Sequence, residues 1–143
     1  LEKRLEAAGY TAKCLFISGS RVPSIPEPNP IYHLPDEEFK RELGRFEGTP
    51  KEVLENQELL DFFLPMLRAD FTMDETYYDK AGIVLHTSIA AFGGEKDGEA
   101  DESAILEWGK YTDNDFNYRI FPGGHFYLRD CEDEVISEVM RLL

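Results

Sequence analysis

The stretch Tyr118-Arg-Ile-Phe-Pro-Gly-Gly-His-Phe126 contains a short apolar strand pattern, a glycine-rich turn and a histidine in direct succession. It leads into a helical pattern over residues 132–143, whose apolar positions share one stripe. Two strand patterns and a further helical pattern precede it, over residues 12–18, 83–92 and 102–111. Strands that alternate with helices pair in parallel, so we predict an α/β fold with a doubly wound sheet.

Residues 35–80 show helical patterns with no strand pattern between them. We expect a capping box at Thr49-Pro-Lys-Glu52 to start one short helix. The longest helix is expected over residues 57–73, with Pro65 kinking or dividing it. Its apolar residues fall on two faces, one with Leu60, Phe63, Leu64, Leu67 and Phe71 and the other with Phe62, Met66 and Met73.

The composition argues against several classes of partner. With 29 acidic and 15 basic residues the formal charge is −14, which opposes binding to nucleic acid or to an anionic membrane surface. No apolar run reaches the roughly 20 residues that span a bilayer, and the N-terminal LEKRLEAAGY does not resemble a signal peptide. Cys14 and Cys131 follow no metal-ligand or disulfide spacing, so we expect free thiols and a cytoplasmic protein.

Asp97 and His125 follow two consecutive strand patterns, where the catalytic groups of parallel sheets gather. The ends of consecutive strands are neighbours, so the carboxylate can accept a hydrogen bond from one ring nitrogen of the histidine. The other nitrogen can then take a proton from a nucleophile. We prefer Asp97 as the acid over its neighbours in the same loop, which are Glu95, Glu99 and Asp101.

Each of these features also has a purely structural interpretation. His125 taken alone is equally consistent with a hydrogen-bonded loop histidine, and the acidic loop with a solvated surface. We expect His33 and His86 to be structural or exposed. The second apolar face of the long helix is explained by burial between neighbouring elements as readily as by ligand binding.

Four segments together resemble the type II thioesterases, stand-alone α/β-hydrolases that serve nonribosomal peptide and polyketide assembly lines in antibiotic biosynthesis. In chain order they are His33-Leu-Pro-Asp-Glu-Glu-Phe39, Gly48-Thr-Pro50, Leu64-Pro-Met-Leu-Arg-Ala-Asp-Phe71 and Phe121-Pro-Gly-Gly-His-Phe126. A fifth segment, Phe92-Gly-Gly-Glu-Lys-Asp97, resembles the acid loop of that family. The resemblance extends over nearly the whole chain.

This resemblance implies an α/β-hydrolase fold, represented here by the C-terminal half of a mostly parallel sheet flanked by helices. Residues 1–34 and 81–143 would belong to the hydrolase core, and residues 35–80 would form a helical lid. Asp97 and His125 would be the acid and base that act on acyl groups carried by the phosphopantetheine of acyl or peptidyl carrier domains. Candidate acyl-chain contacts are Phe62, Met66 and Met73, and no metal or organic cofactor is implied.

The nucleophile is where the sequence departs from the family. The family serine lies in a Gly-x-Ser-x-Gly elbow. No such motif occurs in this sequence; Ser20 follows Gly19 but lacks the second glycine. The chain has no initial methionine and opens inside a helical pattern. We therefore expect the nucleophile and the oxyanion hole upstream of Leu1, on a missing N-terminal portion of roughly 90 to 100 residues.

Taken alone, the chain is expected to be inactive and to fold poorly, because the 12–18 strand would keep an unpaired apolar edge. Two other functions remain open. One is a non-catalytic or truncated hydrolase-fold module that binds carrier domains. The other is an α/β-hydrolase esterase with a different substrate.

Overall fold

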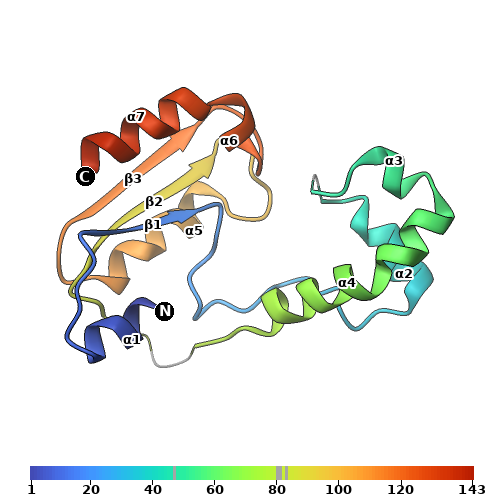
Figure 1. Cartoon of the computed structure of the whole chain (residues 1–143), viewed down its shortest axis with the longest axis horizontal. Helices are drawn as coiled ribbons and strands as arrows, with labels where there is room; N and C mark the ends of the chain where they lie inside the picture. The colour runs from blue at the N-terminus through green and yellow to red at the C-terminus, as the bar shows by residue number, and fades with distance from the viewer. Residues whose placement is uncertain (47, 80–81, 83) are drawn as a thin grey trace. The chain divides into compact units, whose positions relative to one another are not determined.

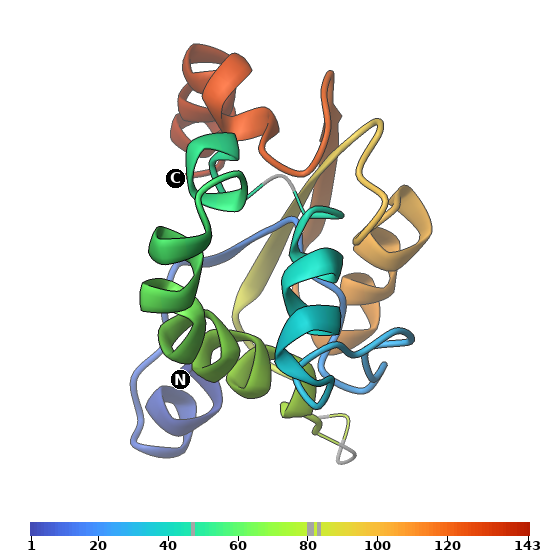
Figure 2. The ribbon, with the colours of Figure 1, turned by 90° about the vertical axis from the view of Figure 1, so that its right-hand side faces the viewer.

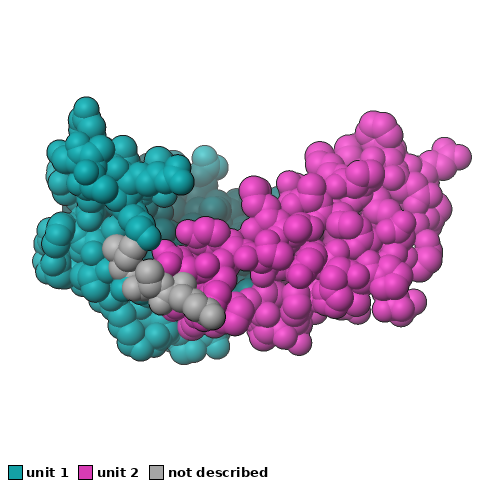
Figure 3. All heavy atoms as spheres, turned by 90° about the horizontal axis from the view of Figure 1, so that it is seen from below, with its two compact units in different colours: residues 1–22, 80–143 teal, residues 23–79 magenta. Residues whose placement is uncertain are grey.

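The computed structural model describes residues 1–46, 48–79, 82 and 84–143. The chain divides into two compact units, which Figure 3 colours separately (Figures 1 and 3). One unit comprises residues 1–22 and 80–143, and the other comprises residues 23–79. In the part of the chain that is described, no helix is both long and apolar enough to cross a membrane.

A three-stranded parallel sheet forms the centre of the first unit. Its strands are β1 (Cys14–Ser18), β2 (Ser88–Gly94) and β3 (Phe116–Phe121), in the spatial order β1-β2-β3. The register places Ser18 beside Phe92 and Gly94 beside Phe121, so the carboxyl ends of the strands lie along one edge of the sheet. The predicted parallel pairing is confirmed.

Helices cover both faces of this sheet. They are α5 (Glu102–Leu106), the 3-10 helix η1 (Glu107–Tyr111), α6 (Tyr127–Asp130) and α7 (Glu132–Leu142), while α1 (Glu2–Ala7) is hydrogen-bonded to Thr87, just before β2. Successive residues of β2 point to opposite faces, so Ile89 packs with Ile105 in one core while Phe92 packs with Tyr127 and Val135 in the other. Accordingly, α5 lies on one side of the sheet and α7 on the other (Figure 2).

The second strand is shorter than its apolar pattern. It begins at Ser88 rather than near residue 83, which lies outside the described residues, and Leu85 makes an isolated bridge before it. The backbone N–H groups of His86 and Thr87 donate instead to the Glu6 carboxylate of α1, at 2.8 and 2.9 Å. These two N–H groups therefore do not take part in strand pairing, and β2 begins after them.

The second unit is helical, with α2 (Asp36–Leu43), α3 (Lys51–Leu54) and α4 (Gln57–Thr76). Leu60 and Leu64 of α4 are buried in a core with Phe39 and Leu43 of α2. The helix α4 continues through Pro65 and is not divided there. Pro65 is on the exposed side of the helix. Leu64 before it and the half-buried Leu67 and Phe71 after it pack in the same core.

The expected capping box at the start of α3 is wrong. The N-cap residue is Pro50, and the helix start has no side-chain cap hydrogen bond. A capping box needs Ser or Thr at the N-cap, and Thr49 lies one residue before that position. A side-chain cap occurs instead on α4, where Asn56 accepts a hydrogen bond from the Leu59 N–H at 3.1 Å.

The proline-rich segment 23–34 groups with the helices, so the division between units falls at residue 22 rather than at the expected residue 34. Two charged side chains of α4 hold this segment. Glu75 accepts hydrogen bonds from the N–H groups of Ile31 and Tyr32 at 2.8 to 3.0 Å. Arg68 donates to the carbonyls of Tyr32 and Leu34 at 2.6 and 2.8 Å.

Candidate active site

The loops that follow β2 and β3 are joined by backbone hydrogen bonds at the carboxyl edge of the sheet. The N–H of Glu95 donates to the carbonyl of Phe121, and the N–H of Lys96 donates to the carbonyl of Gly123, both at 2.8 Å. These bonds bring the loop of Asp97 beside the loop of His125. The two residues selected by their positions after the strands are therefore neighbours.

Asp97 and His125 form a hydrogen-bonded pair. The Nδ1 atom of His125 lies 3.0 Å from Oδ2 of Asp97, whose side chain is 0% exposed. The other carboxylate oxygen, Oδ1, accepts hydrogen bonds from the N–H groups of Glu99 and Ala100 at 2.9 and 3.1 Å. The loop backbone thus holds the carboxylate in place independently of the imidazole. These hydrogen bonds also compensate for burial of the negative charge of Asp97.

The second ring nitrogen of His125 is open. The side chain is 37% exposed, and none of the described residues forms a hydrogen bond with Nε2. When Nδ1 carries the proton and donates to Asp97, Nε2 has a free lone pair. The pair therefore has the arrangement of a general base whose tautomer is set by a buried acid.

The competing carboxylates have other roles or surroundings. Asp101 is the N-cap of α5, accepting from the Ala104 N–H at 2.9 Å and from the Ser103 hydroxyl at 2.6 Å. The Ser103 hydroxyl and then the Ala104 N–H hold the pKa of Asp101 below its ordinary value. Glu95 is exposed and Glu99 is half-buried. Of these four carboxylates, Asp97 is the one that contacts the imidazole.

One glycine in each loop, Gly94 and Gly123, allows the close approach of the two backbones. A Cβ on Gly94 would lie 2.1 Å from the carbonyl oxygen of Gly124, so no larger residue fits there. Gly123 has a φ of +116°, which residues with a side chain rarely adopt. The glycines therefore bring the acid and base loops within hydrogen-bonding distance.

Gly19 is part of the site and was missed by the sequence reasoning. It follows β1 with a φ of +56°, and its N–H donates to the carbonyl of Phe92 at 2.8 Å. A Cβ on Gly19 would lie 3.2 Å from Cε1 of His125 and 3.6 Å from Oδ2 of Asp97. Its position at the end of a strand was the available signal, because the same rule selected the acid and the base.

The candidate acyl-chain contacts lie in the helical unit, on one exposed face of α4. Phe62, Met66 and Met73 are 76%, 54% and 72% exposed. Leu59 and Tyr77 extend the same helical stripe and are also exposed. Within this unit the face is thus available to an apolar ligand rather than buried in the unit's core.

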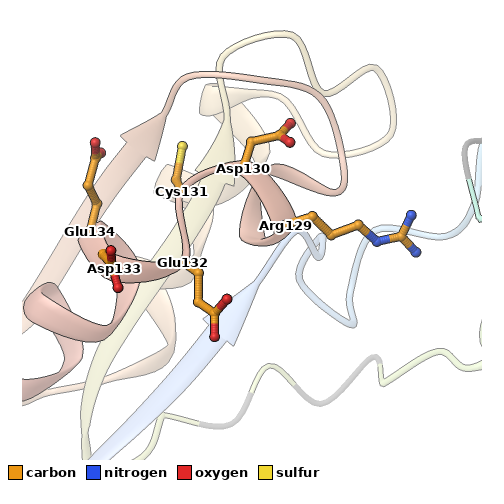
Figure 4. Close-up of a pocket in the computed structure, with 6 residues that line it drawn as sticks. All are labelled: Arg129, Asp130, Cys131, Glu132, Asp133 and Glu134. Carbon is orange, nitrogen blue, oxygen red and sulfur yellow. The ribbon is translucent and has the colours of Figure 1, made fainter.

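A hollow at the junction of α6 and α7 does not coincide with the pair. Residues 129–134 line it, and Figure 4 shows their mainly charged side chains around the bend. Among the described residues, no group of three His, Cys, Asp or Glu side chains is arranged to hold a metal ion. The other histidines lie elsewhere, with His33 exposed and His86 paired with the exposed Asp113.

A parallel sheet with an acid after one strand and a histidine after the next, joined by a hydrogen bond, places the protein among the α/β-hydrolases. Residues 2–143 match the thioesterase domain family, and the chain belongs to that family. The expected fold class is confirmed by solved type II thioesterases, which share this architecture.

Two sequence relatives are named as a thioesterase and as a biosynthesis protein. They are thioesterase PikA5 of Streptomyces venezuelae, 34% identical over 92% of this chain, and gramicidin S biosynthesis protein GrsT of Aneurinibacillus migulanus, 37% identical over 90%. The type II thioesterase YbtT, from the yersiniabactin NRPS/PKS pathway, has a TM-score of 0.87 and 29% identity, over 98% of this chain and 57% of its own. This chain spans about half the length of the two sequence relatives, 47% of PikA5 and 51% of GrsT.

Proposed function

We propose that the full-length protein is a serine-dependent thioesterase that hydrolyses acyl groups from the phosphopantetheine thiol of carrier domains. The observation that carries the proposal is the hydrogen bond between His125 and the buried Asp97, with Nε2 of the ring left open. Relatives named for gramicidin S and yersiniabactin biosynthesis support the kind of substrate. The role would be to clear stalled or wrongly primed intermediates from a peptide or polyketide synthase.

In this mechanism His125 acts twice as a base. Its Nε2 removes the proton of the serine hydroxyl, whose oxygen attacks the thioester carbonyl carbon. The tetrahedral intermediate collapses, the C–S bond breaks, and the departing thiol takes the proton from His125. Water then attacks the acyl-enzyme with the same assistance, releasing the carboxylic acid and the serine. Asp97 holds the imidazole in the required tautomer and stabilises the imidazolium that forms in each step.

We place the nucleophile on a segment outside these 143 residues, because none of the serines in this sequence lies in a Gly-x-Ser-x-Gly elbow. Within the described sheet β1 pairs with β2 on one side, and its other edge is available to a further strand. A strand added there would bring its own carboxyl end beside Gly19 and His125. The oxyanion hole would come with it, since one donor follows the nucleophile. The 143 residues alone would then be inactive.

The helical unit, residues 23–79, is proposed as the lid of this enzyme. The exposed face with Phe62, Met66 and Met73 would contact the acyl chain. A carrier domain that is itself acidic would dock through apolar contacts and local basic groups, because the charge of −14 opposes long-range attraction. The free thiols of Cys14 and Cys131 are consistent with the reducing cytoplasm, where we place both this protein and the synthases on which it would act.

The test compares two substrates and one variant of the full-length protein. Release of acetate from an acetyl-loaded carrier domain is measured beside hydrolysis of a simple oxygen ester of acetate. We expect faster turnover of the carrier thioester and loss of that activity in His125→Ala. Preference for the oxygen ester would indicate an esterase. Binding of the carrier without turnover would indicate a non-catalytic module, and full activity of His125→Ala would rule out the role given to the histidine.

A further inference from the structure

A hydrogen-bonded pair of hydroxyl groups, one on the buried Tyr127 and one on the exposed Ser18, joins the loop of His125 to the end of β1. Tyr127 is 0% exposed, and its hydroxyl oxygen lies 2.7 Å from Oγ of Ser18, the last residue of the strand. Burial raises the pKa of Tyr127, and the negative charge of Asp97 raises it further against the opposing effect of the Ser18 hydrogen bond. The phenol therefore keeps its proton at neutral pH and can donate to Ser18.

Tyr127 is also fixed to the loop that carries His125. Its ring stacks on Phe121 at the end of β3, with a centroid distance of 5.2 Å and an interplanar angle of 6°. Its backbone N–H donates to the carbonyl of Gly124 at 3.1 Å, and its Cβ lies beside Gly123. A movement of Tyr127 would therefore move the base loop with it.

On the other side of the pair, Ser18 is followed directly by Gly19, whose backbone lies against the imidazole. A Cβ on Gly19 would be 3.2 Å from Cε1 and 3.5 Å from Nδ1 of His125, so a side chain there would crowd the ring. The hydroxyl pair therefore sets how closely the backbone after β1 approaches the ring. That contact limits rotation of the ring away from Asp97.

The acid loop holds the same segment, residues 18–21. Arg21 donates from Nη1 to the carbonyl of Glu99 at 2.9 Å, and the N–H of Glu99 in turn donates to Oδ1 of Asp97. The indole N–H of Trp108 donates to the carbonyl of Ser20 at 2.7 Å. The 18–21 segment is thus bonded to the base loop at one end and to the acid loop at the other.

We propose that Tyr127 and Ser18 are positioning residues for the Asp97–His125 pair, because their hydroxyl contact presses the 18–21 segment against the imidazole. In the described part of the chain the two hydroxyls are hydrogen-bonded to each other and His125 to Asp97, so the two residues would act through the position of Gly19 and of the loop of His125. The inference rests on the proposed function for its catalytic consequence, although the geometry of the ring can be measured without turnover.

The first test reads the ring directly in full-length protein labelled with 15N-histidine. The sequence has three histidines, and His125→Ala assigns the signals. In the wild type, neutral His125 should carry its proton on Nδ1, where it faces Asp97. Tyr127→Phe and Ser18→Ala should each raise the Nε2–H fraction several-fold, and the double variant should go no further than either single one.

Two matched variants serve as controls. Tyr118→Phe removes the hydroxyl of an exposed tyrosine on β3, and Ser137→Ala removes that of an exposed serine on α7. Both should leave the ring signals of His125 unchanged. Wild-type ring signals in folded Tyr127→Phe and Ser18→Ala would overturn the proposal, and if one of them does not fold, the other decides.

The second test is kinetic. Displacement of a positioned base slows the chemical step more than binding, so kcat for acetyl-loaded carrier should fall about tenfold with KM unchanged. A rise in KM at constant kcat would contradict a positioning role. Should His125→Ala keep full activity, the proposed function fails, while the ring signals still decide whether Tyr127 and Ser18 orient the histidine.

Discussion

Two features of the structure disfavour a Cβ atom on residue 19. Its φ of +56° is costly for a residue with a side chain, by roughly 1–2 kcal/mol, and its missing Cβ leaves room for the ring of His125. We predict that Gly19→Ala lowers the free energy of unfolding by about that amount and reduces kcat at least tenfold in the full-length protein. Denaturant unfolding and turnover of acetyl-loaded carrier measure the two effects.

Gly9→Ala is the matched control for that substitution. Gly9 has a φ of +84°, but no atom lies within 4 Å of the Cβ position. It should therefore lose a similar amount of stability and keep wild-type kcat. Equal losses of kcat in the two variants would show that backbone strain, and not contact with His125, explains the effect.

At the level of single residues, the contact between Asp97 and His125 was predictable and the surroundings of the two residues were not. Asp97 and His125 follow strand patterns in the sequence, and the rule that ligands gather at strand ends selects them. Only the folded chain brings Gly19, Ser18 and Tyr127 to the pair. Ser18 and Tyr127, whose hydroxyls are in contact, are 109 positions apart in the sequence. No spacing pattern in the sequence predicts such a contact, because it depends on the register of the sheet.

The helix α7 is fixed to β3 by a half-buried ion pair. Glu138 accepts from Arg119 at 3.2 Å and from Arg141 of its own helix. Arg141 first, and then Arg119, lower the pKa of Glu138 below its usual value of 4.5. A carboxyl group with a lowered pKa in the folded state stabilises the fold above about pH 4.5, and this contribution is lost as the pH falls through the lowered pKa.

We therefore predict that Glu138→Gln lowers the free energy of unfolding at pH 7 by about 1 kcal/mol. The difference from wild type should shrink steadily below pH 4.5. Urea unfolding at a series of pH values measures it. Glu134→Gln is the control, because Glu134 lies 3.9 Å from Arg119 and is largely exposed; a larger effect at this position than at Glu138 would contradict the assignment.

The exposed face of α4 leads to a prediction about acyl-chain length. Phe62 is 76% exposed, so Phe62→Ser should change stability by less than about 0.5 kcal/mol. If its ring covers a long acyl chain, kcat/KM for octanoyl-loaded carrier should fall by roughly tenfold or more, while that for acetyl-loaded carrier stays near wild type. Steady-state kinetics with both substrates measures this difference.

Ile136→Ser provides the comparison for the Phe62 variant, since Ile136 is an exposed apolar residue of α7 in the other unit. It should leave both substrates unaffected. Equal losses for acetyl and octanoyl substrates in Phe62→Ser would argue against an acyl-chain contact.

Element types were easier to predict than element ends. The parallel strands and the long α4 follow from apolar periodicity over many residues. The start of β2 was placed too early, because the Glu6 carboxylate takes the backbone donors of His86 and Thr87, which no local pattern reveals. The capping box was wrong because α3 begins at Lys51, which places Pro50 and not Thr49 at the N-cap.

For the molecule as a whole, the α/β-hydrolase fold was predictable and the boundary of the helical unit was not. Alternation of strand and helix patterns along the sequence indicated the parallel sheet. The proline-rich connector was expected to belong to the core because it leaves a core strand. Glu75 and Arg68 hold it to α4 instead, through hydrogen bonds to its backbone from residues more than 30 positions away.

The site itself is assembled from three strand ends. Asp97 follows β2, His125 follows β3, and Gly19 follows β1, the strand beside which we propose that a further strand brings the nucleophile. The central claim is therefore that one buried carboxylate, Asp97, orients one imidazole to activate a serine of the full-length protein.

Intact-protein mass spectrometry of acyl transfer tests that claim most directly. Acetyl-loaded carrier is mixed with full-length protein, and the rate at which the acetyl group appears on the enzyme is followed. We predict that Asp97→Asn acylates roughly 10,000-fold more slowly than wild type, because the ring loses the partner that selects its tautomer. Glu95→Gln, in the same loop but exposed, should acylate at the wild-type rate. Acylation of Asp97→Asn at the wild-type rate would contradict the role assigned to the pair.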